Sequence, residues 1–171
     1  MIKKSLKKAL ANGTINAVAS SVLPGKKKKL NKILAMGETG KNKLNPNSCP
    51  AKITMSLSNC CNLLCPICSV HNLRRQNIER VANNITPEQI KAFDKIFDRA
   101  SSISFMGFIG ESVLNPDFKE IISYLKLKHK LTLDISTNGM GLNEAIQNTM
   151  LKIGFDAITF SIHAATPETY K

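Results

Sequence analysis

The sequence predicts an α/β protein whose parallel sheet is built from strand–helix units. Four short β-type runs alternate with helical segments between residues 50 and 171, and alternation at this spacing favours parallel pairing. The composition, with 43% hydrophobic and 21% charged residues over 171 positions, is that of a folded domain with a sizeable core. A membrane-spanning protein is excluded, because no stretch reaches the roughly 18–20 uninterrupted apolar residues that a span needs.

The four predicted strands are short β-favouring runs bounded by turn signals, and they cover residues 53–57, 102–106, 131–135 and 157–162. Residues of types that often form functional sites follow each of the predicted strands. They are Cys61 to Cys68, Gly110 and Glu111, Asn138 and Gly139, and His163. Because the carboxyl ends of parallel strands meet at one edge of a sheet, we expect a functional site there.

The helical segments carry their own start signals. Thr86-Pro87 predicts a helix start, and apolar residues at helical spacing continue that helix to Phe97. A second helix is predicted after Asn115 and a third over residues 142–153. Thr166-Pro167-Glu168 predicts the start of one more helix after the fourth strand.

Residues 1–48 are predicted to form a basic, helical extension before the body of the chain at residues 49–171. The first fifty residues have eleven lysines and one acid, Glu38, whereas the remainder has thirteen basic and eleven acidic residues. Apolar residues at helical spacing predict two short amphipathic helices separated at Pro24-Gly25. We interpret the extension as a solvated segment that packs one apolar face on the body.

Two binding functions remain open for this extension, namely binding to an anionic membrane surface and binding to nucleic acid. The membrane signal is weak. The nucleic-acid signal is not convincing, because aromatic residues total only 5% and do not interleave with the lysines. A secretory signal is disfavoured, since polar residues interrupt the stretch after Lys8.

The five cysteines favour metal binding in a reducing compartment, and hence a cytoplasmic protein. Four of them lie within nine residues, and their odd number does not suit a disulfide framework. Cys61, Cys65 and Cys68 have the spacing C-x3-C-x2-C, which can place three thiolates around one iron–sulfur cube. Three ligands leave one iron open, and an open position distinguishes catalytic from structural metal sites.

Two alternatives remain open from the cysteine spacing alone. One is a structural zinc site in which Cys60, Cys49 or His71 supplies the fourth ligand. The other is that the cysteines are small buried residues with no ligand role.

The segment from Cys61 to Cys68, Cys-Asn-Leu-Leu-Cys-Pro-Ile-Cys, resembles the signature of the radical S-adenosylmethionine (radical SAM) enzymes. The stretch from Phe105 to Phe118 resembles the family's Gly-Gly-Glu-Pro strand end, and Thr137-Asn138-Gly139 resembles its Thr-Asn-Gly turn. Residues 154–170 resemble the branch with C-terminal auxiliary-cluster (SPASM or twitch) domains. The resemblance covers residues 50–171 and implies a partial, TIM-type (β/α) barrel.

By this resemblance, Cys61, Cys65 and Cys68 would bind a [4Fe–4S] cluster whose fourth iron is chelated by S-adenosylmethionine. Reduction of the cluster by a donor such as flavodoxin or ferredoxin would give a 5′-deoxyadenosyl radical. That radical would abstract hydrogen from a peptide or small-molecule substrate, while the protein orients the cofactor and excludes water. The alternative function is a non-catalytic module that binds zinc or a cluster.

The resemblance also implies the residues that bind the cofactor. Gly110 and Glu111 would receive the methionine amino group, where a carboxylate is the charge match for an ammonium. Thr137 and Asn138 would contact the methionyl carboxylate or the ribose, and so would Ser161.

The sequence departs from the family's pattern at several positions. Ser112 stands in place of the usual proline, Ile109 in place of a frequent glycine, and Ile67 in place of an aromatic residue. His163 stands where the related branch often has aspartate, and we interpret it as a hydrogen-bonded structural residue rather than a group on the substrate side. Cys60 is interpreted as a small strand-end residue.

The family's barrel has six βα units, and about four are predicted in this chain. The chain ends on the first turn of a helix, which would leave the fourth strand as an uncovered parallel edge. We therefore expect a truncated or split enzyme that is completed by a second chain or is inactive alone.

Overall fold

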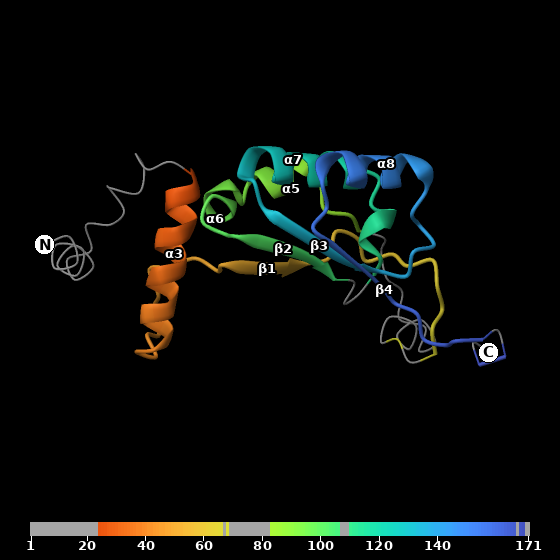
Figure 1. The fold of residues 1–171 in the computed structure, drawn as a ribbon, viewed down its shortest axis with the longest axis horizontal. Coiled ribbons are helices and arrows are strands. Elements are labelled where there is room, and N and C mark those ends of the chain that lie inside the picture. Colours follow the sequence, from red (N-terminus) through yellow and green to blue (C-terminus); the bar gives the residue numbers. More distant parts are fainter. Residues whose placement is uncertain (1–23, 67, 69–82, 107–109, 167, 170–171) are drawn as a thin grey trace, which may run out of the picture.

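The chain folds around a four-stranded parallel sheet with strand order β1-β2-β3-β4 (Figure 1). The structure is a computed structural model and describes residues 24–66, 68, 83–106, 110–166 and 168–169. The strands are β1 (Lys52–Met55), β2 (Ser102–Met106), β3 (Thr132–Thr137) and β4 (Ala157–Phe160). The α/β prediction is confirmed, and the parallel sheet is consistent with part of a TIM-type barrel.

Helices α5 (Pro87–Lys91), α7 (Phe118–His129) and α8 (Glu144–Ile153) cover one face of the sheet (Figure 1). The remaining elements are α3 (Pro24–Thr39), α6 (Asp94–Phe97) and a 3₁₀ turn, η1 (Ser112–Leu114). After β4, Thr169 N donates to Thr166 O at 3.2 Å in a turn, and the continuation of the helix predicted to start there lies outside the described residues.

The helix-covered face of the sheet forms the core. Ile103 and Phe105 of β2 lie in register with Leu133 and Ile135 of β3, and all four side chains are at most 1% exposed. Their spacing of two is what a strand with one buried face requires. The other buried apolar side chains are Leu57, Ile90, Phe97, Ala100, Val113, Phe118, Ile121, Ile122, Leu125, Leu131, Ile146 and Met150.

The opposite face of the sheet is polar. Thr132, Asp134 and Ser136 alternate with the buried residues of β3, and Ser104 of β2 donates a hydrogen bond to Asp134. In a barrel, the face turned away from the outer helices is the interior. Polar residues therefore line this face of the sheet up to the carboxyl ends of the strands.

Hydrogen bonds explain where the segment before β2 begins and bends. Gln89 N donates to Thr86 Oγ1 at 3.3 Å and Thr86 N donates to Gln89 Oε1 at 2.9 Å, which completes a capping box. The helix predicted to continue to Phe97 is interrupted, because Phe93 N donates to Ile90 O, three residues back instead of four. Two short helices, α5 and α6, result.

Helix α3 stands at the end of the sheet where the strands begin (Figure 1). Asn31, which is 5% exposed, holds it there. Its Nδ2 donates to Cys49 O at 2.9 Å and to Arg99 O at 3.2 Å, and its Oδ1 accepts from Cys49 N at 2.8 Å. Helix α3 therefore packs on the body through the polar contacts of Asn31, while Leu30 and Leu34 are partly buried and Ile33 and Met36 are exposed.

Lys28 links α3 to the end of α7. Its Nζ donates to His129 O at 2.6 Å and to Lys130 O at 3.2 Å, where the helix macrodipole favours a positive charge. Burial lowers the pKa of Lys28, and the charge of Asp98 opposes this shift. In the described part of the chain, no helix has the length and apolarity needed to cross a bilayer. The helix predicted before Pro24 lies outside the described residues.

Glu38, the one acid of the basic extension, fixes the loop after α3. It is 8% exposed, and its carboxylate accepts hydrogen bonds at 2.9 Å from Asn47 N, Ser48 N and Lys43 Nζ. These donors, the Asn47 N–H first among them, lower the pKa of Glu38 to about 2.

A polar cluster joins α6 to α7 at the same end of the sheet as α3. Asp94 accepts hydrogen bonds from Lys128 Nζ at 2.5 Å and Tyr124 OH at 2.7 Å, and lies 3.0 Å from His129 Nε2. Partial burial opposes ionisation, but hydrogen bonds from these three residues lower the pKa of Asp94 to about 2.

Candidate cofactor site

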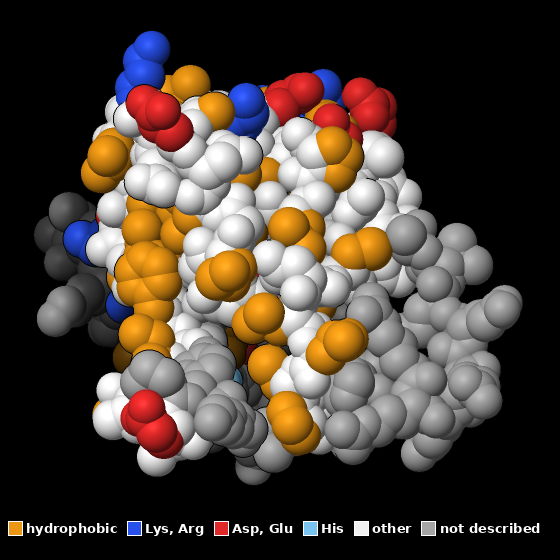
Figure 2. All heavy atoms as spheres, turned by 90° about the vertical axis from the view of Figure 1, so that its right-hand side faces the viewer, with side chains coloured by type: hydrophobic (Ala, Val, Ile, Leu, Met, Phe, Trp, Pro, Cys, Tyr) orange, Lys and Arg blue, Asp and Glu red, His pale blue; other side chains and the backbone are white. Residues whose placement is uncertain are grey.

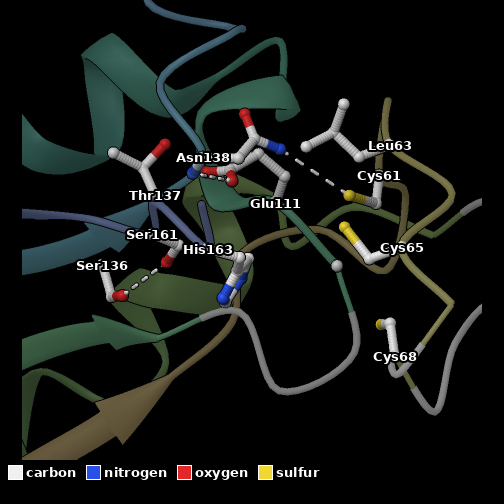
Figure 3. A pocket seen from close by; sticks show the side chains of 11 residues that line it. Cys61, Leu63, Cys65, Cys68, Glu111, Ser136, Thr137, Asn138, Ser161 and His163 are labelled. Atoms are coloured by element: carbon white, nitrogen blue, oxygen red, sulfur yellow. Dashed lines mark hydrogen bonds between the residues drawn. The ribbon is translucent and has the colours of Figure 1, made fainter. Parts of the chain in front are cut away.

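A pocket of about 310 Å³ lies at the carboxyl ends of the strands (Figure 3). This is the edge of the sheet at which the sequence predicts a site. The segments that follow β1, β2 and β4 contribute to it, together with the end of β3. Its lining residues, which include every predicted cluster and cofactor residue, are Cys61, Leu63, Cys65, Cys68, Gly110, Glu111, Ser136, Thr137, Asn138, Ser161 and His163.

The three cysteines of the C-x3-C-x2-C motif share one side of this pocket, with their sulfurs directed into it (Figure 3). Cys68 N donates to Cys65 O at 3.0 Å, which closes a turn between the last two cysteines. Cys60 is not among the lining residues, and its Sγ contacts Asn59 Oδ1 at 3.7 Å. All five cysteines are free and partly buried.

The spacing of these thiols bears on the zinc alternative. Among the described residues, which include all five cysteines but not His71, no three His, Cys, Asp or Glu side chains converge to hold a single metal ion. A structural zinc site needs four ligands within about 2.0–2.3 Å of one ion. His71, one of the fourth ligands considered for zinc, lies outside the described residues, so that form of the alternative is not tested.

Glu111 is the acidic residue of the pocket, and it is only 5% exposed. Its backbone N donates to Cys60 O at 2.6 Å, and its Oε2 accepts from Asn138 N at 2.9 Å. Its Oε1 is buried and has no hydrogen-bond partner within the described part of the chain. An unpaired buried carboxylate oxygen is costly, so this atom fits a cationic donor supplied by a ligand.

Gly110 lets the end of β2 approach the start of the cysteine loop. A Cβ atom at this position would lie 2.3 Å from Ser58 O and 2.6 Å from Asn59 C. Both are backbone atoms, so no side chain could move aside. The glycine is therefore required by this contact, which places the neighbouring Glu111 beside the cysteines.

The turn after β3 is built by hydrogen bonds within the Thr-Asn-Gly motif. Thr137 is 1% exposed, and its Oγ1 accepts from Gly139 N at 3.1 Å. Asn138 Oδ1 accepts from Met140 N at 2.9 Å. Gly139 has a φ of 79°, in the left-handed region that favours glycine, and a Cβ there would lie 3.2 Å from the ring of Phe160.

Ser136, Ser161 and His163 form the side of the pocket opposite the cysteines (Figure 3). Ser136 Oγ lies 3.4 Å from Ser161 Oγ, and Ser161 N donates to Thr137 O at 2.8 Å. His163 is exposed and has no hydrogen-bond partner among the described residues. The interpretation of His163 as a hydrogen-bonded structural residue is therefore not supported.

Sequence reasoning missed two residues that support the cysteine loop. Ser112, noted only as a departure from proline, is 1% exposed, and its Oγ accepts from Leu57 N at 3.2 Å. Asn115 Nδ2 donates to Leu57 O and to Ile85 O, both at 2.8 Å. Both side chains hold the backbone just before the cysteines. The sequence signal that could have identified both residues is their polar side chains in an otherwise apolar turn.

Among the described residues, the side chains around the pocket carry little charge. On the end of the molecule where the strands finish, hydrophobic and uncharged side chains predominate, and most charged side chains lie along the helix layer (Figure 2). Leu64 and Met140, which follow the first cysteine and the Thr-Asn-Gly turn, are 60% and 71% exposed. Glu111 is the one Asp or Glu side chain among the described lining residues.

Comparison with known proteins places this site in a family. A family model described as the radical SAM superfamily matches residues 55–171, so the chain belongs to the radical SAM superfamily. Members use a [4Fe–4S] cluster and S-adenosylmethionine, and they typically need a reductant such as flavodoxin or ferredoxin. Membership of the SPASM or twitch branch stays a prediction.

Two curated relatives share part of the sequence. One, named probable GTP 3′,8-cyclase, from Thermococcus kodakarensis, is 29% identical over 119 residues, covering 70% of this chain and 37% of that protein. The other, a GTP 3′,8-cyclase from Aquifex aeolicus, is 31% identical over 121 residues, with the same coverage of 70% and 37%. The matched region thus spans about a third of each relative's length.

Solved structures share the fold. A crystal structure of BtrN in complex with AdoMet and 2-DOIA matches with a TM-score of 0.53 and 20% identity, over 68% of this chain and 47% of that one. BtrN in an open conformation matches with a TM-score of 0.54 and 19% identity, over 71% and 54%. At this identity the likeness shows the fold alone.

Proposed function

We propose that the chain binds a [4Fe–4S] cluster through Cys61, Cys65 and Cys68 and binds S-adenosylmethionine beside it for reductive cleavage. The observation that carries this proposal is the unpartnered, buried Oε1 of Glu111, in one pocket with three free thiols. Three thiolates would leave one position of a four-iron cluster for the cofactor. When bound and reduced, the cluster and cofactor supply a 5′-deoxyadenosyl radical that abstracts a hydrogen atom from substrate.

The residues of the chain have separate tasks in this proposal. Glu111 Oε1 would accept a hydrogen bond from the ammonium of the cofactor's methionine, a charge-assisted contact in a mostly water-free position. Gly110 would keep that carboxylate close to the cysteines. Thr137 and Ser161 would shape the side that receives the carboxylate or ribose. His163, exposed at the mouth of the pocket, remains available to a substrate.

The proposal stops at the cleavage of the cofactor and the abstraction of hydrogen. Substrates named for the relatives are not transferred, because the matched region is only 37% of their length. The substrate proposed is a peptide or small molecule, and the reductant a flavodoxin or ferredoxin.

The test is anaerobic reconstitution with iron and sulfide, followed by electron paramagnetic resonance (EPR) of the reduced protein as S-adenosylmethionine is added. We expect about four iron and four sulfide per chain, and a [4Fe–4S]⁺ signal whose shape changes with the cofactor. Absence of a cluster, or a signal indifferent to S-adenosylmethionine, would contradict the proposal.

Two variants assign the role of Glu111. Glu111→Gln keeps an acceptor for the Asn138 N–H and removes the charge, so it should retain the cluster and bind the cofactor about 10- to 100-fold more weakly. Glu120→Gln is the matched control, since that side chain is 61% exposed on α7. Equal S-adenosylmethionine affinity in the two variants would show that Glu111 does not bind the cofactor.

A further inference from the structure

The side chain of Asn138 bridges the turn after β3 and the cysteine loop (Figure 3). Its Nδ2 donates to Asn62 Oδ1 at 2.9 Å and lies 3.8 Å from Cys61 Sγ, within the longer range of hydrogen bonds to sulfur. Its Oδ1 accepts from Met140 N at 2.9 Å, which fixes the orientation of the amide. Its backbone N donates to Glu111 Oε2 at 2.9 Å.

These contacts account for the whole hydrogen-bonding capacity of the Asn138 amide as a donor. A side-chain amide has two N–H hydrogens. One is directed at Asn62 and the other at Cys61, so neither is left for the methionyl carboxylate or the ribose of a cofactor. A hydrogen bond donated by this side chain to the methionyl carboxylate, one of the contacts that the family resemblance implies, conflicts with this geometry.

We propose that Asn138 is a positioning residue of the cluster, whose Nδ2–H donates a hydrogen bond to the Cys61 thiolate and thereby raises the reduction potential. This inference rests on the proposed function. It assigns to the Asn138 side chain a contact with the ligand sulfur in place of a contact with S-adenosylmethionine. The backbone N–H of the same residue holds Glu111, so one turn orients both a cluster ligand and the cofactor's carboxylate partner.

The direction of the effect follows from charge. Reduction adds one electron to a cluster already surrounded by thiolates, and hydrogen bonds to the sulfurs stabilise the more negative state. The effect is strong where water is scarce, because the local dielectric is low. Cys61 is partly buried and Glu111, in the same pocket, is 5% exposed, so the hydrogen bond from Asn138 lies where little water is present.

The experiment is a redox titration of the reconstituted full chain, followed by EPR, with and without the substitution Asn138→Ala. The loss of one hydrogen bond corresponds to about a fivefold change in an equilibrium constant. At 59 mV per tenfold change for one electron, the reduction potential should fall by about 40 mV. Asn62→Ala is the matched control, because it removes the other acceptor and leaves the N–H directed at sulfur, and its potential should equal that of the wild type.

A second measurement does not depend on the variant retaining its cluster. Wild-type protein carrying ¹⁵N in the asparagine side-chain amide should show a ¹⁵N coupling to the reduced cluster by pulsed EPR. An unchanged potential in Asn138→Ala, or no ¹⁵N coupling in the wild type, would overturn the inference even if S-adenosylmethionine still perturbs the spectrum. A wild type that assembles no cluster would instead overturn the proposed function, and this inference with it.

Discussion

Replacing Gly110 by alanine should damage both the stability of the fold and the cofactor pocket. The added Cβ would lie 2.3 Å from Ser58 O, 2.6 Å from Asn59 C and 2.7 Å from Asn59 Cα. All three atoms belong to the backbone that leads into the cysteine loop. Relief of the overlap therefore requires the end of β2 to separate from that backbone.

The cost can be worked from the contacts that separation would strain. Glu111 N donates to Cys60 O at 2.6 Å directly beside the overlap, and Asn59 N donates to Asn83 O at 3.1 Å. Overpacking a well-packed site costs about 1–3 kcal/mol, and one weakened hydrogen bond adds about 1 kcal/mol. We expect Gly110→Ala to lower the free energy of unfolding by about 2–4 kcal/mol.

Urea unfolding of the cluster-free protein, followed by circular dichroism, measures this loss. Gly37→Ala in α3 is the control, because a Cβ there has no atom within 4 Å. That substitution should stabilise the protein by about 0.5–1 kcal/mol, as alanine favours a helix interior. If Gly110→Ala and the wild type unfolded at the same urea concentration, the close approach of β2 to the cysteine loop would be refuted.

Substitutions elsewhere separate cluster ligation, helix docking and acid sensitivity. Cys61→Ala should abolish iron binding after reconstitution while Cys60→Ala retains it, and equal loss would contradict the ligand assignment. Asn31→Ala removes three backbone contacts and should cost about 2–3 kcal/mol in urea unfolding, against less than about 0.5 kcal/mol for the exposed Lys32→Ala. The Asp94 pKa of about 2 lies below the ordinary 3.8, so its stabilisation is complete above about pH 4 and is lost as pH falls through about 2. Between about pH 4 and about pH 2, the free energy of unfolding of cluster-free Asp94→Asn should therefore fall less than that of the wild type. The difference between the two losses should be on the order of 1 kcal/mol.

Much of the fold was predictable because its signals are local. Alternation of apolar and polar residues from Leu131 to Ile135 predicted β3, although the strand extends to Thr137. Thr86 with Pro87 predicted the start of α5, and a capping box is present there. The continuous helix predicted to Phe97 was wrong, since the tightened hydrogen bonding that divides it has no clear sequence signal.

The residues of the candidate site were predictable as a set, whereas their contacts were not. Topology brings strand ends together, so Cys61, Glu111 and Ser161 could be placed at one edge from strand order alone. The support that Ser112 gives to Leu57 joins positions 55 residues apart. Such a contact depends on the side-chain rotamer and on backbone distance, which no local pattern encodes.

Helix α3 lies at the end of the sheet where the strands begin (Figure 1). The pocket is lined by residues at the carboxyl ends of the strands, and this separation constrains what the lysines can do. Lys28 is engaged with the last carbonyls of α7, so part of the positive charge of α3 stabilises the fold itself. The exposed Lys26 and Lys29 remain for an anionic surface, and a partner bound there would leave the pocket open. Cofactor binding should therefore be insensitive to charge reversal at these two lysines. A change in S-adenosylmethionine affinity after such reversal would mean that the two ends of the sheet are energetically coupled.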